Sequence, residues 1–260
     1  RIKFSAMLIF LSMWLLIVYV PVTHWVWGGG ILSSWGTMDF AGGIVVHATA
    51  GTAALVTALT LGKRRGFPKS ITPPHSPILT MIGASMLWIG WFGFNAGSAL
   101  GANGGAGMAM LVTHISAATA SLVWMFIEWK RFGKPSLIGI VTGMVAGLAT
   151  VTPASGYIGV PGGLILGFFG GLLCYLAVDF IRGKLQIDDS LDVFAVHGVG
   201  GILGTLLVAF LATSTFSGLG LAEGQTAISQ FFVQLKAVIL TVVWTSLFTY
   251  LILKITSFIV

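Results

Sequence analysis

The chain has 260 residues, of which 56% are hydrophobic and only 8% are charged, and its mean hydropathy is +0.99. These values exclude an ordinary soluble domain or soluble enzyme and predict an integral membrane protein. The formal net charge of +6 does not indicate nucleic-acid binding, because most of the basic residues lie between the apolar segments. The one cysteine, Cys174, lies in an apolar run, so an intrachain disulfide is excluded and we expect no redox chemistry.

Glycine, proline and charged residues divide the chain into eight apolar segments that we interpret as membrane-spanning helices, each of which needs roughly 20 residues. We therefore predict an all-α bundle of eight transmembrane helices, and not a β-barrel. The glycine-rich composition suits this class, because small residues let helices approach closely in lipid, as in GMVAG at 143–147 and GLILG at 163–167. The predicted helices cover residues 4–22, 40–61, 77–99, 105–127, 137–152, 161–181, 190–211 and 227–258.

The basic residues predict the orientation of the bundle in a cell membrane. If the first helix runs outward from the cytoplasm, nearly all of them fall on the inner side. This inner set is Arg1, Lys3, Lys63, Arg64, Arg65, Lys69, Lys130, Arg131, Lys134, Arg182, Lys184 and Lys254. Lys236 alone falls on the outer side, and the sequence indicates no role for it. Since the chain opens at Arg1 without a Met or a leader sequence, we expect it to begin partway through a longer protein.

An Asp followed eight residues later by a His occurs twice, in DFAGGIVVH at 39–47 and in DSLDVFAVH at 189–197. Each Asp opens a predicted helix, where its carboxylate can cap free N–H groups. Eight residues place each His roughly 12 Å into its helix. Because the two helices start at opposite faces of a core about 30 Å thick, we expect His47 and His197 to meet near its middle. Inverted repeats place a transport site at that depth.

A facing pair of neutral imidazoles can share a proton and also bond a small polar molecule, because each ring has one donor and one acceptor nitrogen. Ionisable residues within a membrane usually line a pathway, which favours a functional role for this pair. An electron-transfer protein with His47 and His197 as haem ligands is an alternative, although closely packed helices leave little room for a haem. We expect no cofactor or metal. For His114, in the fourth span, a bond to a neighbouring helix is the simpler expectation.

The third predicted span ends on the outer side with WIGWFGFNAGS at 88–98. Trp91 and Phe94 are three residues apart and share a helix face, and Ser98 lies one turn further out. Aromatic faces and a hydroxyl oxygen suit a small cation that also donates hydrogen bonds. A packed helix end would have the same residues, so this pattern alone leaves both interpretations open.

Five motifs in order resemble the ammonium transporter family (Amt/MEP/Rh) along essentially the whole chain, which we interpret as one membrane domain over residues 1–260. The Trp before the glycine triplet resembles the Amt branch more than the Rh glycoproteins. The motifs are WGGG at 27–30, DFAGGIVVH at 39–47, WFGFNAGS at 91–98, TPASGYIG at 152–159 and DVFAVHGVGG at 192–201.

The resemblance implies a transporter, not an enzyme, that forms a homotrimer in the lipid bilayer and carries ammonium or ammonia through a narrow apolar pore in each subunit. It also implies roles for eight residues. Trp27 and Ser98, with Trp91 adjacent, would bind the substrate on the outer side, and Phe94 would gate the pore below them. His47 and His197 would form a twin-histidine proton relay, Asp39 would be an acid near the outer binding site, and Asp189 would be its equivalent in the second repeat.

Members of the family have eleven spans, and this chain resembles the last eight, so the first three and a second gating Phe are missing from it. Our hypothesis is that ammonium loses a proton near Phe94 and Asp39 and passes the two His as ammonia, while the imidazoles relay the proton. The main alternative is an ammonium sensor whose membrane domain signals to a fused cytoplasmic domain. A cytoplasmic regulatory protein is a further expected partner.

Overall fold

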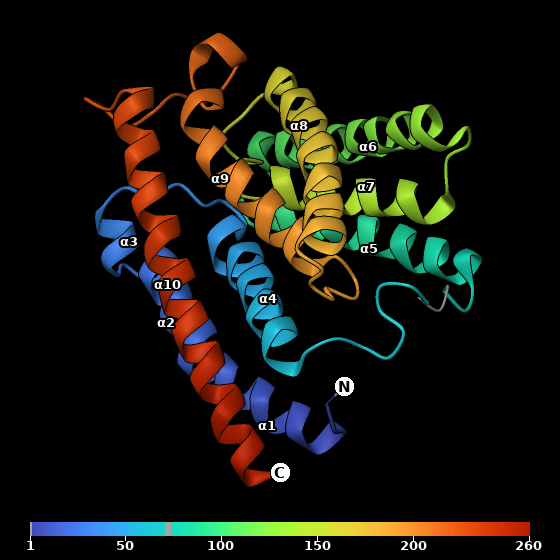
Figure 1. The fold of residues 1–260 in the computed structure, drawn as a ribbon. Helices are drawn as coiled ribbons and strands as arrows, with labels where there is room; N and C mark the ends of the chain where they lie inside the picture. The colour runs from blue at the N-terminus through green and yellow to red at the C-terminus, as the bar shows by residue number, and fades with distance from the viewer. Residues whose placement is uncertain (1, 71–73) are drawn as a thin grey trace.

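The computed structural model describes residues 2–70 and 74–260, and the chain in these two ranges is helical without β-strands (Figure 1). The all-α prediction is therefore confirmed, while Arg1, one of the predicted inner-side cations, lies outside the described residues. The elements in chain order are α1 Phe4–Trp14, η1 Leu15–Tyr19, α2 Val20–Trp27, α3 Ile31–Ser34, η2 Gly43–Ala48, α4 Thr49–Leu61, α5 Pro77–Gly97, α6 Gly104–Phe132, α7 Leu137–Val151, α8 Val160–Val178, η3 Asp179–Lys184, η4 Phe194–Gly198, α9 Val199–Leu211, η5 Ser214–Phe216 and α10 Ala227–Ile259.

In the described part of the chain, seven helical stretches are long and apolar enough to cross a membrane, and they correspond to seven of the eight predicted spans. The remaining prediction, residues 137–152, is α7, an apolar helix of 15 residues. α7 packs against α5, α6, α8 and α9, and most of its residues are buried. Protein therefore surrounds much of this shorter helix. The seven stretches are Phe4–Ser34, Gly43–Leu61, Pro77–Gly97, Gly104–Phe132, Val160–Lys184, Phe194–Leu211 and Ala227–Ile259.

The first helix continues to Trp27, beyond its predicted end at residue 22, although it contains Pro21. A proline has no N–H group and clashes with the carbonyl four residues earlier, here that of Ile17. The chain forms the π-helical turn η1 at this point, and the Ile17 carbonyl accepts a hydrogen bond from Nε1 of Trp244 at 3.2 Å. A side chain of α10 thus satisfies a carbonyl next to the proline, as buried backbone groups in a membrane require.

Two glycine patterns pack α7 and α8 against α6. A Cβ atom on Gly147 of α7 would lie 2.4 Å from the carbonyl oxygen of Ser116, and one on Gly167 of α8 would lie 2.6 Å from the same atom. Ser116 in turn donates its hydroxyl to the Gly147 carbonyl at 2.8 Å. The small-xxx-small patterns at 143–147 and 163–167 therefore contribute to helix contacts in which the backbones nearly touch.

The long helix α10 runs along one side of the bundle, next to α1 and α4 (Figure 1). Its fully buried Gln234 connects it to the segment before Asp39. The amide Nε2 of Gln234 donates to the carbonyls of Met38 and Thr205 at 2.7 and 2.9 Å, and Oε1 accepts from the Met38 N–H at 2.8 Å. These bonds fix the chain at the point where it turns into the second span.

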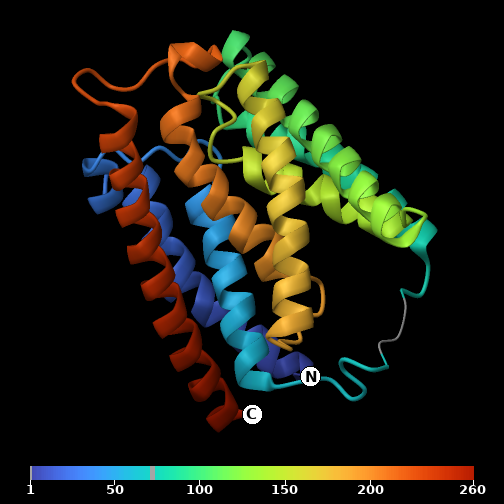
Figure 2. The same cartoon turned by 45° about the horizontal axis from the view of Figure 1, so that its top comes forward.

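Both termini and the turn after α4 lie at one end of the bundle (Figure 2). Nζ of Lys3 donates to the carbonyl of Val260 at 3.2 Å, and Lys3 and Lys254 border one shallow cavity there. We call this the basic end, because it holds Lys3, Lys63, Arg64 and Lys254. The grouping agrees with the single-sided distribution of positive charge that the sequence predicts.

Candidate functional site: a histidine pair at a helix crossing

His47 and His197 face each other across the crossing of their two helices, as the repeated Asp–His spacing predicts. Their Nδ1 atoms are 3.2 Å apart, and their ring centroids are separated by 5.2 Å with 30° between the ring planes. One ring can therefore donate its Nδ1 proton to the other. Two nitrogen atoms at this distance leave no room for iron and a porphyrin between them, which argues against the haem alternative.

Both His lie in π-helical turns, a feature that the sequence analysis missed. His47 belongs to η2, the first turn of the second span, and His197 belongs to η4, the first turn of the seventh. Such turns are rare in proteins and occur often at functional sites. The local signal is the glycine pair at the start of η2, where Gly42 precedes the turn with a φ of 114° that favours glycine and Gly43 opens it.

The two Asp cap these π-helical turns, as predicted. The carboxylate of Asp39 accepts hydrogen bonds from the backbone N–H groups of four residues, at 2.6 to 3.1 Å. The carboxylate of Asp189 accepts from two, those of Val193 and Phe194, at 3.0 and 2.8 Å. Both side chains are therefore structural anchors for the helices that carry the His, with the stronger anchor at Asp39. Its four donors are Gly42, Gly43, Ile44 and Val45.

The helices cross where glycines remove the side chains between them. A Cβ atom on Gly51 would lie 2.3 Å from Cα of Gly198, and one on Gly201 would lie 2.5 Å from Cβ of His47. Real Cβ contacts are longer than this, so the observed approach of the two backbones needs glycine at both positions. Gly51 lies four residues after His47, and Gly201 lies four residues after His197. This crossing explains why both positions are glycine.

Two aromatic side chains of α5 lie against the His pair. The Trp91 ring is stacked on His47 at a centroid distance of 5.3 Å, and Phe94 lies at 6.4 Å from His47 in an edge-on arrangement. The sequence analysis grouped Trp91 with the outer binding residues. The structure places its ring beside the His pair, and Nε1 of Trp91 donates to Thr152 Oγ1 at 2.9 Å. A role of Trp91 in outer binding stays a prediction.

Thr152 belongs to a buried polar network that the sequence analysis did not single out, although Thr152 and Asn95 fall within two of the quoted motifs. Its hydroxyl lies 2.7 Å from the Leu148 carbonyl and 3.3 Å from Oδ1 of Asn95. Nδ2 of Asn95 donates to Thr113 Oγ1 at 2.9 Å. The network links α5, α6 and α7 directly behind Trp91, and a fully hydrogen-bonded buried network of this kind holds its members in fixed positions.

The His pair borders a mostly apolar cavity of about 410 Å³. A second cavity, of about 460 Å³, shares Ala50 and Val193 with the first and extends to Asp188 and Asp189. The two cavities together follow the helix crossing from the His pair toward the basic end. The residues that line the first are Val46, His47, Ala50, Leu87, Gly90, Trp91, Phe94, Val193 and His197.

Trp27 and Ser98, the other residues predicted to bind substrate on the outer side, donate hydrogen bonds to nearby backbone carbonyls. Nε1 of Trp27 donates to the carbonyl of Asp39 at 2.8 Å, which ties the end of α2 to the first cap. The Ser98 hydroxyl donates to the Phe94 carbonyl at 2.9 Å, one turn back in α5. Trp27 is 45% exposed in the described chain.

His114 and Lys236, which the sequence analysis did not place at the site, have aromatic partners. His114 is stacked on Trp88 with a centroid distance of 5.2 Å, in agreement with a contact to a neighbouring helix. Nζ of Lys236 lies 3.7 Å from the ring centroid of Trp35, a cation–π contact in the N-terminal part of α10. Neither residue lines the cavity beside the His pair.

The comparisons with known proteins agree with the all-helical fold. The ammonium transporter Amt1 of Archaeoglobus fulgidus is 50% identical over 233 residues, which are 88% of this chain and 59% of that protein. The crystal structure of Candida albicans Mep2 has 37% sequence identity and a TM-score of 0.87, over 96% of this chain and 57% of that one. A structure described as Sensor Amt Protein has 32% identity and a TM-score of 0.84, over 92% and 61%.

The chain spans about three-fifths of the length of these relatives. The family model described as Ammonium Transporter Family matches residues 1–260, the whole of the sequence. With a model match of this extent and half of the aligned residues identical to a curated relative, the chain belongs to the ammonium transporter family.

Proposed function

We propose that this protein passes ammonium across a membrane as ammonia, along the apolar cavity that His47 and His197 border. The observation that carries the proposal is the 3.2 Å contact between the two Nδ1 atoms. Nε2 of His47 is buried and has no hydrogen-bond partner among the described residues. A buried polar atom without a partner is costly, and a small hydrogen-bonding substrate would satisfy it.

Charge favours ammonia over ammonium as the species in this cavity. Moving a cation into the centre of a bilayer costs at least about 2.5 kcal/mol, while one cation–π contact returns about 0.5 to 2 kcal/mol. The walls offer aromatic rings and two imidazoles but no carboxylate. Ammonium would therefore lose its proton before it passes the His pair, near Phe94 and Asp39, and the imidazoles would carry the proton separately.

Trp27 and Ser98 are the proposed outer binding residues, because the aromatic ring of the exposed Trp27 and the hydroxyl of Ser98 suit a cation that donates hydrogen bonds. Trp91 has a further proposed role. Since it is stacked on His47, it would form the wall of the pathway beside the imidazole pair. Phe94, edge-on to the same ring, would close the pathway on the outer side of the pair.

A homotrimer in the cell membrane, with one pathway in each subunit, is the proposed assembly, and a cytoplasmic regulatory protein is a proposed partner. Sensing is the less favoured function. A solved neighbour is described as a sensor, whereas curated relatives at 40 to 50% identity are named ammonium transporters. If the protein were a sensor, the same residues of the pathway would bind ammonium without carrying a sustained flux of it.

The test is the double variant His47→Leu/His197→Leu, reconstituted in proteoliposomes. We expect it to lose the ammonium-driven current or its selectivity over potassium, because an apolar pair can neither relay a proton nor bond the substrate. His114→Leu is the matched control, since it removes an imidazole of a spanning helix outside the cavity, and it should conduct normally. If the double variant kept the wild-type current and selectivity, the relay would be wrong.

A further inference from the structure

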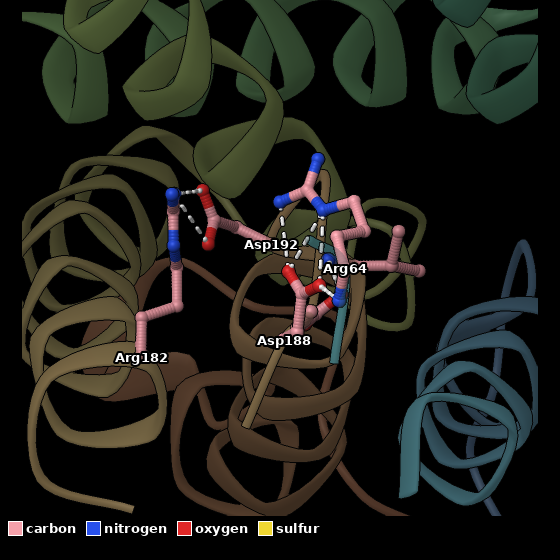
Figure 3. Close-up of polar contacts among 6 residues, drawn as sticks. Arg64, Arg182, Asp188 and Asp192 are labelled. Atoms are coloured by element: carbon pink, nitrogen blue, oxygen red, sulfur yellow. Dashed lines mark hydrogen bonds and ion pairs between the residues drawn. The ribbon is translucent and has the colours of Figure 1, made fainter. Parts of the chain in front are cut away.

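The helices that carry the two His are joined a second time, at the basic end, by an ion pair between Arg64 and Asp188 (Figure 3). Arg64 follows the end of α4 by three residues, and Asp188 directly precedes the cap Asp189. The guanidinium approaches both carboxylate oxygens, with NH2 at 2.7 Å from Oδ1 and Nε at 3.0 Å from Oδ2. The backbone N–H of Arg64 donates to the same carboxylate at 2.7 Å.

The Asp188 carboxylate is fully buried, whereas the Arg64 side chain is 37% exposed. A buried carboxylate needs a charged partner with good geometry, and a two-pronged guanidinium contact supplies it in one orientation only. Because a backbone group takes part as well, the bond fixes the path of the chain after α4 and not only a flexible side chain. The inner ends of the two helices are therefore held at a set separation.

This second junction decides how the helices cross. Gly51 and Gly198 give a contact without side chains, about which two helices could pivot. His197 directly precedes one of these glycines and His47 lies one turn before the other, so a pivot there would move the rings relative to each other. A junction at Arg64 and Asp188, after the end of α4 and just before the start of the seventh span, removes that freedom.

A second ion pair holds the same turn from the other side. NH1 of Arg182, at the end of α8 and η3, lies 3.1 Å from Oδ2 and 3.3 Å from Oδ1 of Asp192 (Figure 3). The turn 188–192 is thus fixed between two arginines, Arg64 in the segment after α4 and Arg182 in η3, and the seventh span starts directly after it.

We propose that Arg64 and Asp188 are a positioning pair that sets the crossing angle of the two histidine helices and thereby keeps the Nδ1 atoms of His47 and His197 within hydrogen-bond distance. Its importance for transport rests on the proposed function, but the geometry that it controls can be measured without transport. A merely structural ion pair would stabilise the fold and leave the contact between the imidazoles unchanged whenever the protein is folded.

The experiment is solid-state NMR of the lipid-reconstituted protein labelled with ¹⁵N-histidine. The Nδ1 signal shared by the two imidazoles is assigned by its loss in His47→Gln. In Arg64→Met and in Asp188→Asn we expect this shared signal to be lost, because the inner ends of the helices separate. In Arg64→Lys, which keeps the charge without the two-pronged contact, we expect the signal to be weakened. An unchanged signal in all three variants would overturn the proposal.

The double variant Arg64→Met/Asp188→Asn separates positioning from stability. It leaves neither an unpaired buried charge nor an unpaired backbone N–H, so it should fold better than the single variants. We expect it still to lack the shared signal. If the signal returned together with stability, the pair would be structural only, and the proposal would be wrong.

Asp179→Asn is the matched control, because Asp179 forms an ion pair with Arg131 between η3 and α6, and neither residue belongs to the two histidine helices. This variant should keep the shared signal. If it lost the signal, the loss would not be specific to the Arg64–Asp188 pair, and the proposal would be overturned. The proposed function fails independently, if the wild-type protein shows the NMR signal but carries no ammonium in proteoliposomes.

Discussion

Gly51 of α4 lies against Gly198 of the seventh span so closely that a Cβ atom on Gly51 would be 2.3 Å from the Cα atom of Gly198. The contact is between two backbones, so no side chain can move aside to relieve it. Since His197 is the neighbour of Gly198 and His47 is one turn from Gly51, this approach brings the imidazoles together. The distance between the two His is therefore set by glycines as much as by the His themselves.

Gly51→Ala should separate the two helices. We expect a loss of about 1 to 3 kcal/mol in the free energy of unfolding, which is typical of overpacking, and a reduced rate of ammonium uptake. Thermal unfolding in detergent and uptake in proteoliposomes are the measurements. Gly83→Ala is the control, because a Cβ atom at this helical glycine of α5 meets nothing within 4 Å. Equal behaviour of the two variants would contradict the role of the crossing.

The two caps should differ in strength. The Asp39 carboxylate accepts hydrogen bonds from four backbone N–H groups, whereas the Asp189 carboxylate accepts them from two. We expect Asp39→Ala to lower the free energy of unfolding by about 2 to 4 kcal/mol and Asp189→Ala by about 1 to 2 kcal/mol. Unfolding of both variants in the same detergent gives the comparison, and the reverse order would show that hydrogen-bond count does not decide the strength of the caps.

The meeting of the two His could be predicted from the sequence, because the repeated Asp–His spacing places both at the same distance from a capping Asp. The helices begin at Gly43 and Phe194 and not at the Asp, so each His lies in a first turn and not roughly 12 Å into its helix, as expected from the helix rise. The caps followed from the same local pattern, since a carboxylate at a helix start bonds residues three to six positions away. The boundaries of most spans could also be predicted from the local sequence, because glycine, proline and charged residues mark them. These features need no knowledge of what the helices contact.

The surroundings of the pair could not be predicted in the same way, because they depend on contacts between distant segments. Trp91 turns toward His47 because its N–H is bonded to Thr152, which is 61 residues away. The turn η2 packs Cβ of His47 against Gly201 of another helix. The first helix passes Pro21 with the help of Trp244 from the last. A single sequence without a fold does not reveal these pairings.

Thr152→Val should disturb the wall beside the His pair. The substitution keeps the shape of the side chain but leaves the buried N–H of Trp91 without its acceptor, which costs about 1 to 3 kcal/mol of stability. We also expect slower ammonium transport, because the Trp91 ring loses the bond that holds it against His47. Thr142→Val is the control on α7, since the Thr142 hydroxyl bonds only within its own helix, to the Ile138 carbonyl. Similar transport by both variants would contradict this prediction.

Asp192 should make the stability of the protein depend on pH. Burial raises the pKa of this carboxyl to about 6 from its ordinary value of 3.8, and the nearby Arg182 opposes the rise without cancelling it. The folded protein therefore holds this proton more tightly than the unfolded chain does. The resulting stabilisation is fully present below pH 3.8 and is lost as the pH rises through about 6.

Asp192→Asn tests this sign. At about 1.4 kcal/mol per pKa unit, the carboxyl contributes a fall of about 3 kcal/mol in the free energy of unfolding between pH 4 and pH 7. Asn cannot titrate and tolerates the positive φ of 55° at this position, so the variant should lose this part of the fall while keeping the turn. Melting temperatures of the wild type and the variant across that pH range give the answer. If the two pH profiles ran parallel, Asp192 would not be the titrating group, and the Arg182–Asp192 pair would be equally strong at both ends of the range.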